Sequence, residues 1–229
     1  MIRRNLRRIK RLLMPVRVIG QPSLRCPSLR LGTEYGGWTI NPALLDPSSI
    51  VYSAGVGEDI SFDLALIERF GTTIHAFDPT PRSLAWLKSQ RLPPSFVIHG
   101  YGLAKTEGDL TFNTPKNPAH VSLSILDNHS TSQITLPVRK LGSVMKELGH
   151  SHLDLLKMDI EGSEYGVIED LVASAIPIRQ LLVEYHHRFA SVGASHTEDS
   201  IKLLEDSGFR LFNISESGEE YSFLRTQFP

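Results

Sequence analysis

The feature that most constrains this chain is an alternation, beginning near residue 49, of short apolar runs with segments of helical periodicity. Parallel strands buried on both faces read as short apolar runs, and the helices that cover them read as the periodic segments between. The pattern changes at the end of the chain, where Phe209–Ile214 and Glu220–Arg225 flank a short turn-forming segment. Two strands joined in this way form an antiparallel hairpin. The sequence therefore predicts an α/β fold with a mostly parallel sheet and a C-terminal antiparallel hairpin.

The expected elements fall into three groups. Strands of the parallel sheet are predicted over residues 49–53, 73–77, 95–99, 153–158 and 180–184. Helices are predicted over residues 59–70, 82–90, 143–148, 163–174 and 197–207. An insertion over residues 108–138 has its own strand patterns at 109–113 and 133–138, and the loop between them is a natural place for a cover over a substrate.

The first 17 residues are strongly basic, although the whole chain of 229 residues carries a net charge of −1. They contain seven Lys and Arg residues and no acidic residue, so the remainder has 17 basic against 25 acidic residues, a charge of −8. A body this acidic is a poor match for nucleic acid, and no nucleic-acid partner is expected. Residues 2–13 place apolar and basic side chains on opposite arcs at helical spacing, and Pro15 ends the pattern. The segment predicts a basic amphipathic helix that either lies on an anionic membrane or packs on its own domain or a partner.

These patterns divide the chain into a basic helix over residues 1–16, an approach segment over 17–48 and a main domain over 49–229. Cys26 is the single cysteine, which excludes an intramolecular disulfide and a cysteine-based zinc cluster. A reducing, cytoplasmic location is therefore expected, with peripheral membrane contact through residues 2–13 left open.

Candidate chemistry begins where the first predicted strand gives way to a helix, at Gly55 and Gly57. Two glycines two residues apart let the backbone approach a ligand, and the following helix offers its amino terminus. Asp78 stands 21 residues beyond Gly57, at the end of the next strand, where a carboxylate accepts hydrogen bonds from the ribose of an adenosine cofactor. The alternative is a plain tight turn, with Asp78 as a helix cap. The joint placement of the three residues at strand ends favours cofactor binding.

Charged residues that follow the fourth strand of the parallel sheet form a second candidate group. Two-residue periodicity places three of them on one side of the chain, namely Lys157, Asp159 and Glu161. A lysine among apolar residues needs a carboxylate partner, so Lys157 is expected to pair with Asp159 or Glu184. A glycine then permits a sharp turn, and Ser163 is expected to cap the next helix.

Two adjacent histidines, His186 and His187, follow the fifth strand. Neighbours in an extended chain point to opposite sides, so one of the two faces the ligand crevice. A neutral imidazole there either takes a proton from a hydroxyl or ligates a divalent metal beside Asp159 and Glu161. A structural or solvated histidine is the alternative. A base that acts without a metal is favoured, because the ligand spacing is not diagnostic.

Four segments, 50–59, 75–81, 101–104 and 155–164, occur in an order and at intervals that resemble the FkbM-type S-adenosylmethionine-dependent methyltransferases. The Lys-x-Asp-x-Glu-Gly run that begins at Lys157 is the most specific of them. Segments 34–38, 121–128 and 184–187 are similar to the methyltransferase-like branch of that family. The resemblance implies a Rossmann-like class I fold with a seven-stranded sheet, S-adenosylmethionine as the cofactor, and methyl transfer, commonly to an oxygen of a small molecule or saccharide.

The resemblance also assigns roles to residues. Gly55 and Gly57 would border the methionine part of the cofactor, and Asp78 would hold its ribose. Asp159 would lie near the amino group and sulfonium. The cofactor set comprises Ser53, Gly55, Gly57, Asp78, Tyr101, Gly102, Leu103 and Asp159, with the residues from Tyr101 to Leu103 along the adenine. Ser53 departs from the family pattern, because many methyltransferases have an acidic residue there.

The chemistry of the acceptor adds further candidates. An alcohol is too weak an acid to ionise unaided, so Glu161, His186 or His187 is expected to act as the base, and Ser122 and Ser124 form the candidate substrate loop. A metal held by Asp159, Glu161 and His186 is the alternative. Two other functions remain open, an NAD(P)-dependent oxidoreductase that uses the same glycine turn and a non-catalytic, membrane-associated scaffold with the same fold.

Overall fold

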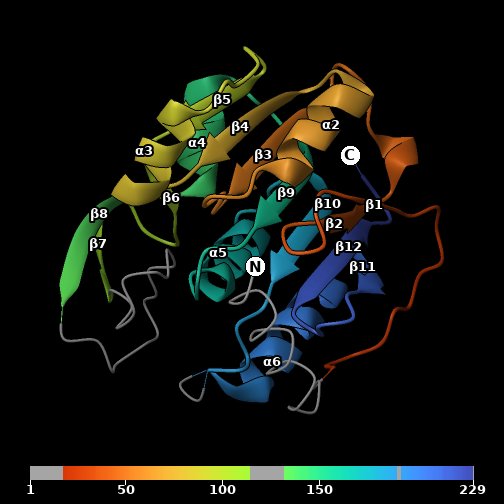
Figure 1. Ribbon diagram of the computed structural model, residues 1–229. Helices are drawn as coiled ribbons and strands as arrows, with labels where there is room; N and C mark the ends of the chain where they lie inside the picture. Colours follow the sequence, from red (N-terminus) through yellow and green to blue (C-terminus); the bar gives the residue numbers. More distant parts are fainter. Residues whose placement is uncertain (1–17, 114–131, 190–191, 229) are drawn as a thin grey trace.

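The computed structural model describes residues 18–113, 132–189 and 192–228 of the chain (Figure 1). The basic helix expected over residues 2–13 and the substrate-loop candidates Ser122 and Ser124 lie outside the described residues. Their roles, the membrane contact and the division of the chain at residues 16 and 48 stay predictions.

A seven-stranded sheet forms the centre of the fold, with the strand order β11-β12-β10-β9-β3-β4-β5 (Figure 1). Its strands are β3 (Ile50–Ala54), β4 (Thr73–Phe77), β5 (Phe96–His99), β9 (Leu153–Met158), β10 (Ile178–Glu184), β11 (Phe209–Ile214) and β12 (Glu220–Arg225). Neighbouring strands are parallel from β10 to β5, whereas β12 is antiparallel to both β10 and β11. The predicted sheet and its C-terminal hairpin are therefore confirmed. Every residue of β9 is buried, because this central strand is covered on both faces.

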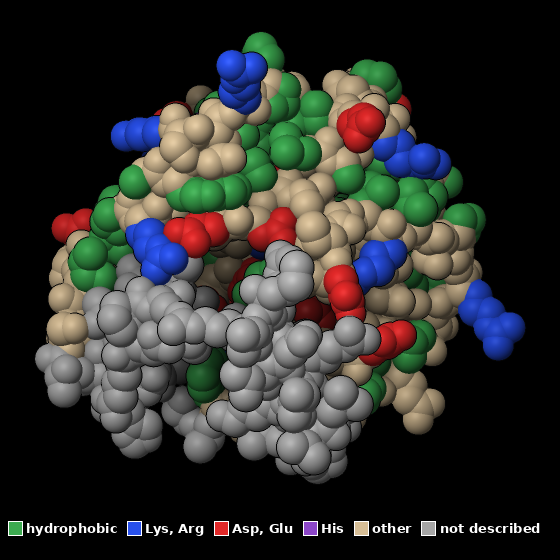
Figure 2. Space-filling view, viewed as in Figure 1, with side chains coloured by type: hydrophobic (Ala, Val, Ile, Leu, Met, Phe, Trp, Pro, Cys, Tyr) green, Lys and Arg blue, Asp and Glu red, His purple; other side chains and the backbone are tan. Residues whose placement is uncertain are grey.

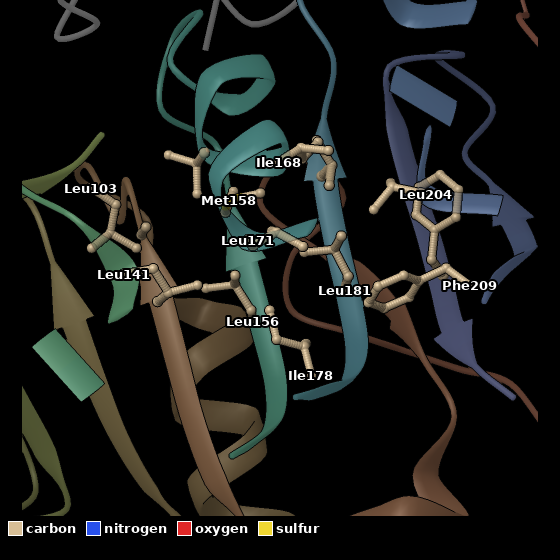
Figure 3. Close-up of a cluster of buried hydrophobic side chains, with 14 of the residues drawn as sticks. Leu103, Leu141, Leu156, Met158, Ile168, Leu171, Ile178, Leu181, Leu204 and Phe209 are labelled. Carbon is tan, nitrogen blue, oxygen red and sulfur yellow. The ribbon is translucent and has the colours of Figure 1, made fainter. Parts of the chain in front are cut away.

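Helices cover both faces of the sheet. They are α2 (Ser61–Phe70), α3 (Pro81–Ser89), α4 (Leu141–Leu148), α5 (Glu164–Ala173) and α6 (Gly193–Asp206), so each predicted helix is found with its ends displaced by at most four residues. α2 and α3 pack into one core, and α4, α5 and α6 pack into the other. Figure 3 shows the second core, where Met158 of β9 gathers with Ile168 and Leu171 of α5. Among the helices that the structure describes, none has the length and apolar character needed to cross a membrane.

The insertion after β5 forms a separate three-stranded sheet with the order β6-β8-β7. Its strands are β6 (Gly102–Leu103), β7 (Gly108–Asn113) and β8 (Gln133–Arg139). The two strands predicted for the insertion are confirmed, whereas β6 is an unpredicted pairing of two residues with the end of β8. This pairing holds the segment that follows β5 in place beside the central sheet.

A short hairpin that the sequence did not predict lies ahead of the central sheet. It comprises β1 (Leu29–Leu31), β2 (Trp38–Ile40) and a 3-10 turn at Pro42–Leu44. Three-residue strands are too short to show an alternating pattern. Trp38 and Ile40 nevertheless enter the core that contains α2 and α3, and the Thr39 carbonyl accepts a 2.8 Å hydrogen bond from the Ser222 hydroxyl of β12. The hairpin is thereby attached to β12, the second strand from one edge of the sheet.

Three histidines and a tyrosine form a cluster on one face of β3, β4 and β5. His75 Nδ1 lies 3.1 Å from His99 Nε2, and the Tyr52 hydroxyl lies 2.8 Å from His150 Nδ1. Burial, together with the neighbouring His99 and His150, lowers the pKa of His75 to about 4. Burial also lowers the pKa of His99 and of His150. The cluster is therefore built for neutral imidazoles.

The low pKa of His75 makes the stability of the fold sensitive to acid. The unfolded chain takes up a proton near pH 6.5, whereas the folded chain resists protonation of His75 until about pH 4. Stability from this residue is thus present above pH 6.5 and is lost as the pH falls toward 4. We predict that the urea midpoint falls over this window in the parent chain and falls less steeply in His75→Phe.

His196→Gln is the control, because His196 is an exposed histidine of α6 that lies outside this cluster. Its urea midpoints should follow the pH dependence of the parent chain. Identical pH slopes for the parent chain and His75→Phe would contradict the prediction.

Candidate functional site

The carboxyl ends of β3, β4, β9 and β10 meet at one edge of the sheet and carry most of the predicted site residues. Figure 2 shows acidic side chains around a hollow on this face of the molecule, close to where β9 and β10 end in the same view of Figure 1. Crevices at the carboxyl ends of parallel strands are where open α/β sheets bind ligands.

The glycine turn after β3 passes very close to the end of β9. Gly55 and Gly57 both have left-handed backbones, with φ of 74° and 57°. A Cβ on Gly55 would lie 1.6 Å from the Asp159 carbonyl oxygen, whereas a Cβ on Gly57 would meet nothing within 4 Å. Gly55 is therefore required for the approach of two strand ends, and Gly57 borders open space that a ligand can occupy.

Asp78 ties the end of β4 to the same turn. Its Oδ2 accepts a 2.9 Å hydrogen bond from the Gly57 amide, and its Oδ1 accepts a 2.8 Å hydrogen bond from the Thr80 amide. Asp78 does not cap α3 in the predicted alternative sense, because Thr80 occupies the capping position and makes no side-chain cap hydrogen bond. An ionised carboxylate has about four acceptor positions, so two remain for the hydroxyls of a ribose.

The other predicted cofactor residues lie on either side of this turn. Ser53 is fully buried within β3 and lies beside Asp63 of α2, where burial raises the pKa of Asp63 and Ser53 opposes the rise. Tyr101 follows β5, with its ring 5.7 Å from that of Phe77 at the end of β4. Gly102 packs against Pro79, since a Cβ there would lie 3.2 Å from the Pro79 ring. The segment expected along the adenine therefore lies next to Asp78.

Lys157 does not form the predicted ion pair with Asp159 or Glu184. Its ammonium group donates to the carbonyl oxygens of Gly55 at 2.7 Å and Ala54 at 3.3 Å, and it lies 5.5 Å from the centre of the Trp38 ring. The Ala54 carbonyl also accepts a 3.1 Å hydrogen bond from the Asp159 amide, whereas Gly55 lies beyond the end of β3, where the lysine supplies a donor to its carbonyl.

The turn after β9 is organised by Glu164, which the sequence analysis did not single out. Its carboxylate is fully buried and accepts hydrogen bonds from the amides of Ile160 at 2.7 Å and Gly162 at 2.8 Å. Ser163 occupies the N-cap position of α5 as predicted, but its side chain makes no cap hydrogen bond. Each of the two Glu164 oxygens accepts from one of these amides. An acidic residue in the first helical turn, two residues after a glycine, was the available signal.

His186 is the histidine that lies among the acidic residues, and its side chain is fully buried. Its Nε2 lies 3.2 Å from a Glu161 oxygen and 3.9 Å from an Asp159 oxygen, while its Nδ1 lies 3.2 Å from a Glu164 oxygen. Burial works against a charged imidazole, yet Glu164 and Glu161 outweigh it and hold the pKa of His186 well above its usual value. His187 is half-buried beside this cluster. The catalytic roles of Glu161, His186 and His187 stay predictions.

The carboxyl groups of Asp159 and Glu184 also have raised pKa values. Burial raises the pKa of Asp159 to about 6, with Glu161 adding to the rise and Lys157 opposing it. Burial and the nearby Asp159 also raise the pKa of Glu184. Single oxygen or nitrogen atoms of Asp159, Glu184 and His186 all lie within 4.8 Å of one another. Glu184, predicted only as an alternative partner of Lys157, thus belongs to the cluster, because the register of β10 against β9 brings the two strand ends together.

Comparisons with known proteins agree on one family. A sequence profile described as the methyltransferase FkbM domain matches residues 50–211. The probable methyltransferase-like protein 24 of Rattus norvegicus is 32% identical over 178 residues, which cover 71% of this chain. The 31-O-demethyl-FK506 methyltransferase FkbM of Streptomyces tacrolimicus is 24% identical over 197 residues, which cover 72% of this chain and 74% of that protein.

The matches cover different shares of the related proteins. The chain spans 42% of the length of the methyltransferase-like relatives from Rattus norvegicus and Homo sapiens. Among solved structures, fibrillarin of Aeropyrum pernix with natively bound S-adenosyl-L-methionine aligns with a TM-score of 0.44 and 11% identity, covering 89% of this chain and 84% of that one.

The two glycines of the turn provide a matched test of the close approach. Both Gly55→Ala and Gly57→Ala put a side chain on a left-handed backbone, which costs about 1–2 kcal/mol. Gly55→Ala also drives its Cβ into the Asp159 carbonyl, and forced repacking adds about 1–3 kcal/mol or more. We predict that urea unfolding finds Gly55→Ala less stable than Gly57→Ala by at least this second amount. Equal stabilities of the two variants would show that the strand ends separate without cost.

Proposed function

Because the chain belongs to the FkbM family of methyltransferases, we propose that it transfers the methyl group of S-adenosylmethionine to a hydroxyl oxygen of a small molecule or saccharide. S-adenosylmethionine is the cofactor, and when bound it supplies a methyl group activated by the positive charge of its sulfonium. The observation that carries the proposal is the joint placement of the glycine turn, Asp78 and the acidic cluster around His186 at one edge of the sheet.

The residues of this edge suit the cofactor in shape and charge. Open space beside Gly57 admits a ligand to the turn, and Asp78 has acceptor positions left for its ribose. The carboxylates of Asp159, Glu161 and Glu184 lie beyond the turn, where they favour a positively charged group. Tyr101 and Gly102, next to Asp78, offer a wall for the adenine.

The acceptor hydroxyl is proposed to lie against Glu161 and His186. Glu161 is held with a left-handed backbone of φ 52°, at the tip of the turn that Glu164 ties down. Residues other than glycine rarely adopt this conformation, so it persists where the surroundings impose it. The side chain is thereby aimed at His186, in a geometry suited to orient a hydroxyl and take its proton.

Transfer to oxygen is favoured over transfer to other atoms by one relative. The Streptomyces tacrolimicus relative is named as a methyltransferase of 31-O-demethyl-FK506. The match to that protein covers 72% of this chain. A hydroxyl acceptor must lose a proton, and the Glu161 and His186 pair is placed to accept it. An acceptor that needs no deprotonation would not require this pair.

The ribose contact of Asp78 can be measured directly. Asp78→Ala removes a charged hydrogen-bond acceptor, so calorimetric titration with S-adenosylmethionine should show a loss of about 1.5–3 kcal/mol, or roughly 10- to 150-fold in affinity. Asp46→Ala is the control, because Asp46 makes the same local hydrogen bond, to an amide two residues on, ahead of the opposite end of β3. It should leave the affinity unchanged. Tight binding of NAD without binding of S-adenosylmethionine would refute the cofactor assignment and favour the oxidoreductase.

The proposed roles of Glu161, His186 and His187 are tested by measuring cofactor binding and methyl transfer separately. Glu161→Gln, and at least one of His186→Ala and His187→Ala, should keep the affinity for S-adenosylmethionine and lower the methyl-transfer rate by about 10²- to 10⁴-fold. The rate is measured with labelled S-adenosylmethionine against a panel of saccharides and polyols. Glu216→Gln, in an exposed turn of the β11–β12 hairpin, is the control. Parental rates in all three site variants would remove these residues from the catalytic machinery.

A further inference from the structure

We propose that Asp159, Glu184 and His186 form a binding site for a divalent cation of the Mn²⁺ and Mg²⁺ class. The site would lie beside the cofactor, and its use in methyl transfer rests on the proposed function. The three side chains come from the ends of β9 and β10, which are adjacent parallel strands in the rigid centre of the sheet. A site built on such elements is held more precisely than one built on a free loop.

The spacing of the donor atoms fits one cation. One atom from each of the three side chains lies within 4.8 Å of the other two. Around a six-coordinate ion with bonds of about 2.1 Å, neighbouring ligand atoms stand about 3 Å apart and opposite ones about 4.2 Å apart. Small side-chain adjustments therefore bring all three atoms into contact with a single ion.

His186 supplies an independent observation that points to a ligand. Its side chain is fully buried, and within the described part of the chain neither ring nitrogen completes a hydrogen bond, although carboxylate oxygens lie 3.2 Å from each. Glu164 faces Nδ1 from 3.2 Å, while Glu161 and Asp159 face Nε2 from 3.2 Å and 3.9 Å. This is the arrangement of a metal-binding histidine, in which a carboxylate behind the ring fixes its orientation and the other nitrogen binds the ion. A cation at Nε2 would take the place of the proton that Glu161 and Glu164 favour on the ring, and the same carboxylates would then face the cation.

The excess of negative charge around the site also favours the binding of a cation. Asp159, Glu161 and Glu184 converge there, while the ammonium of Lys157 donates to the carbonyls at the end of β3. Arg188 is shared, at 3.5 Å from Glu184 and 2.8 Å from Glu219. With Glu164 counted, the carboxylates therefore outnumber the cationic groups even when His186 carries a proton, and a divalent ion offsets the excess negative charge.

The donor set selects the class of ion and has a consequence for the acceptor. Carboxylates suit Mg²⁺ and Mn²⁺, and an imidazole among them shifts the preference toward a transition metal, which makes Mn²⁺ the better probe. Three protein ligands leave three positions of a six-coordinate ion open. Two adjacent hydroxyls of an acceptor can occupy them, so the site favours acceptors that carry neighbouring oxygens, as saccharides do.

The test is a titration of the purified full chain with Mn²⁺ in the absence of S-adenosylmethionine, with free Mn²⁺ followed by electron paramagnetic resonance. The parent chain should bind one Mn²⁺, and Glu184→Gln should weaken that binding at least about tenfold. Glu219→Gln is the matched control, because it removes a neighbouring carboxylate that also pairs with Arg188 but lies outside the donor set. Its affinity for Mn²⁺ should match that of the parent.

A second variant and a second ligand make every outcome decisive. Asp159→Asn should also weaken Mn²⁺ binding and serves where Glu184→Gln proves unstable on thermal unfolding. Absence of stoichiometric Mn²⁺ binding up to concentrations on the order of 1 mM, or equal binding in the parent and both site variants, would overturn the cation site. Calorimetry with S-adenosylmethionine on the same samples keeps the two ideas apart. Cofactor binding without Mn²⁺ binding leaves the proposed function standing, and Mn²⁺ binding without cofactor binding leaves the cation site standing.

Discussion

The close approach of the turn after β3 to the end of β9 is the constraint on which the site depends. Gly55 has no Cβ, so the Asp159 carbonyl can occupy the space beside it, and the Asp159 amide donates a 3.1 Å hydrogen bond to the Ala54 carbonyl. Lys157 secures the junction from the same strand by donating to the Gly55 carbonyl. One side of this junction leads to the glycine turn and Asp78, and the other leads to the acidic turn. The glycine turn and the acidic turn are thus joined by backbone contacts that the Lys157 side chain secures.

Buried carboxylates that accept hydrogen bonds from backbone amides fix the turns at this edge of the sheet. Asp78 connects the β4 end to Gly57, and Glu164 connects Ile160 to Gly162. Each satisfies amide groups in turns that cannot satisfy them within a helix or strand. Glu164 also faces His186, so the turn and the imidazole are positioned by one side chain. Burial raises the pKa of both Asp159 and Glu184, and the neighbouring carboxylates add to the rise. The convergence of these acidic side chains is the physical basis of the proposals for this edge of the sheet.

The fold followed from the sequence because its signals are local. Apolar runs separated by helical periodicity predict the parallel strands and the covering helices, and the run from Phe209 to Arg225 predicts the hairpin. The β1–β2 hairpin and β6 were missed, since strands of two or three residues have no period to detect. The positions of Gly55, Gly57, Asp78, Asp159 and Glu161 at strand ends were accessible in the same way, because strand ends follow from strand patterns.

The sequence by itself determined the α/β class, the family and the residue types available at the edge of the sheet. Only the tertiary structure decided how those residues pair. Lys157 lies among carboxylates in the sequence, yet it donates to carbonyls, because the register of β9 against β3 brings its ammonium to the end of that strand. His186 rather than His187 meets Glu161 and Glu164, and Glu184 joins Asp159, because β10 lies beside β9 in a fixed register. Contacts between strand ends far apart in the chain depend on register and packing, and no local sequence pattern encodes them.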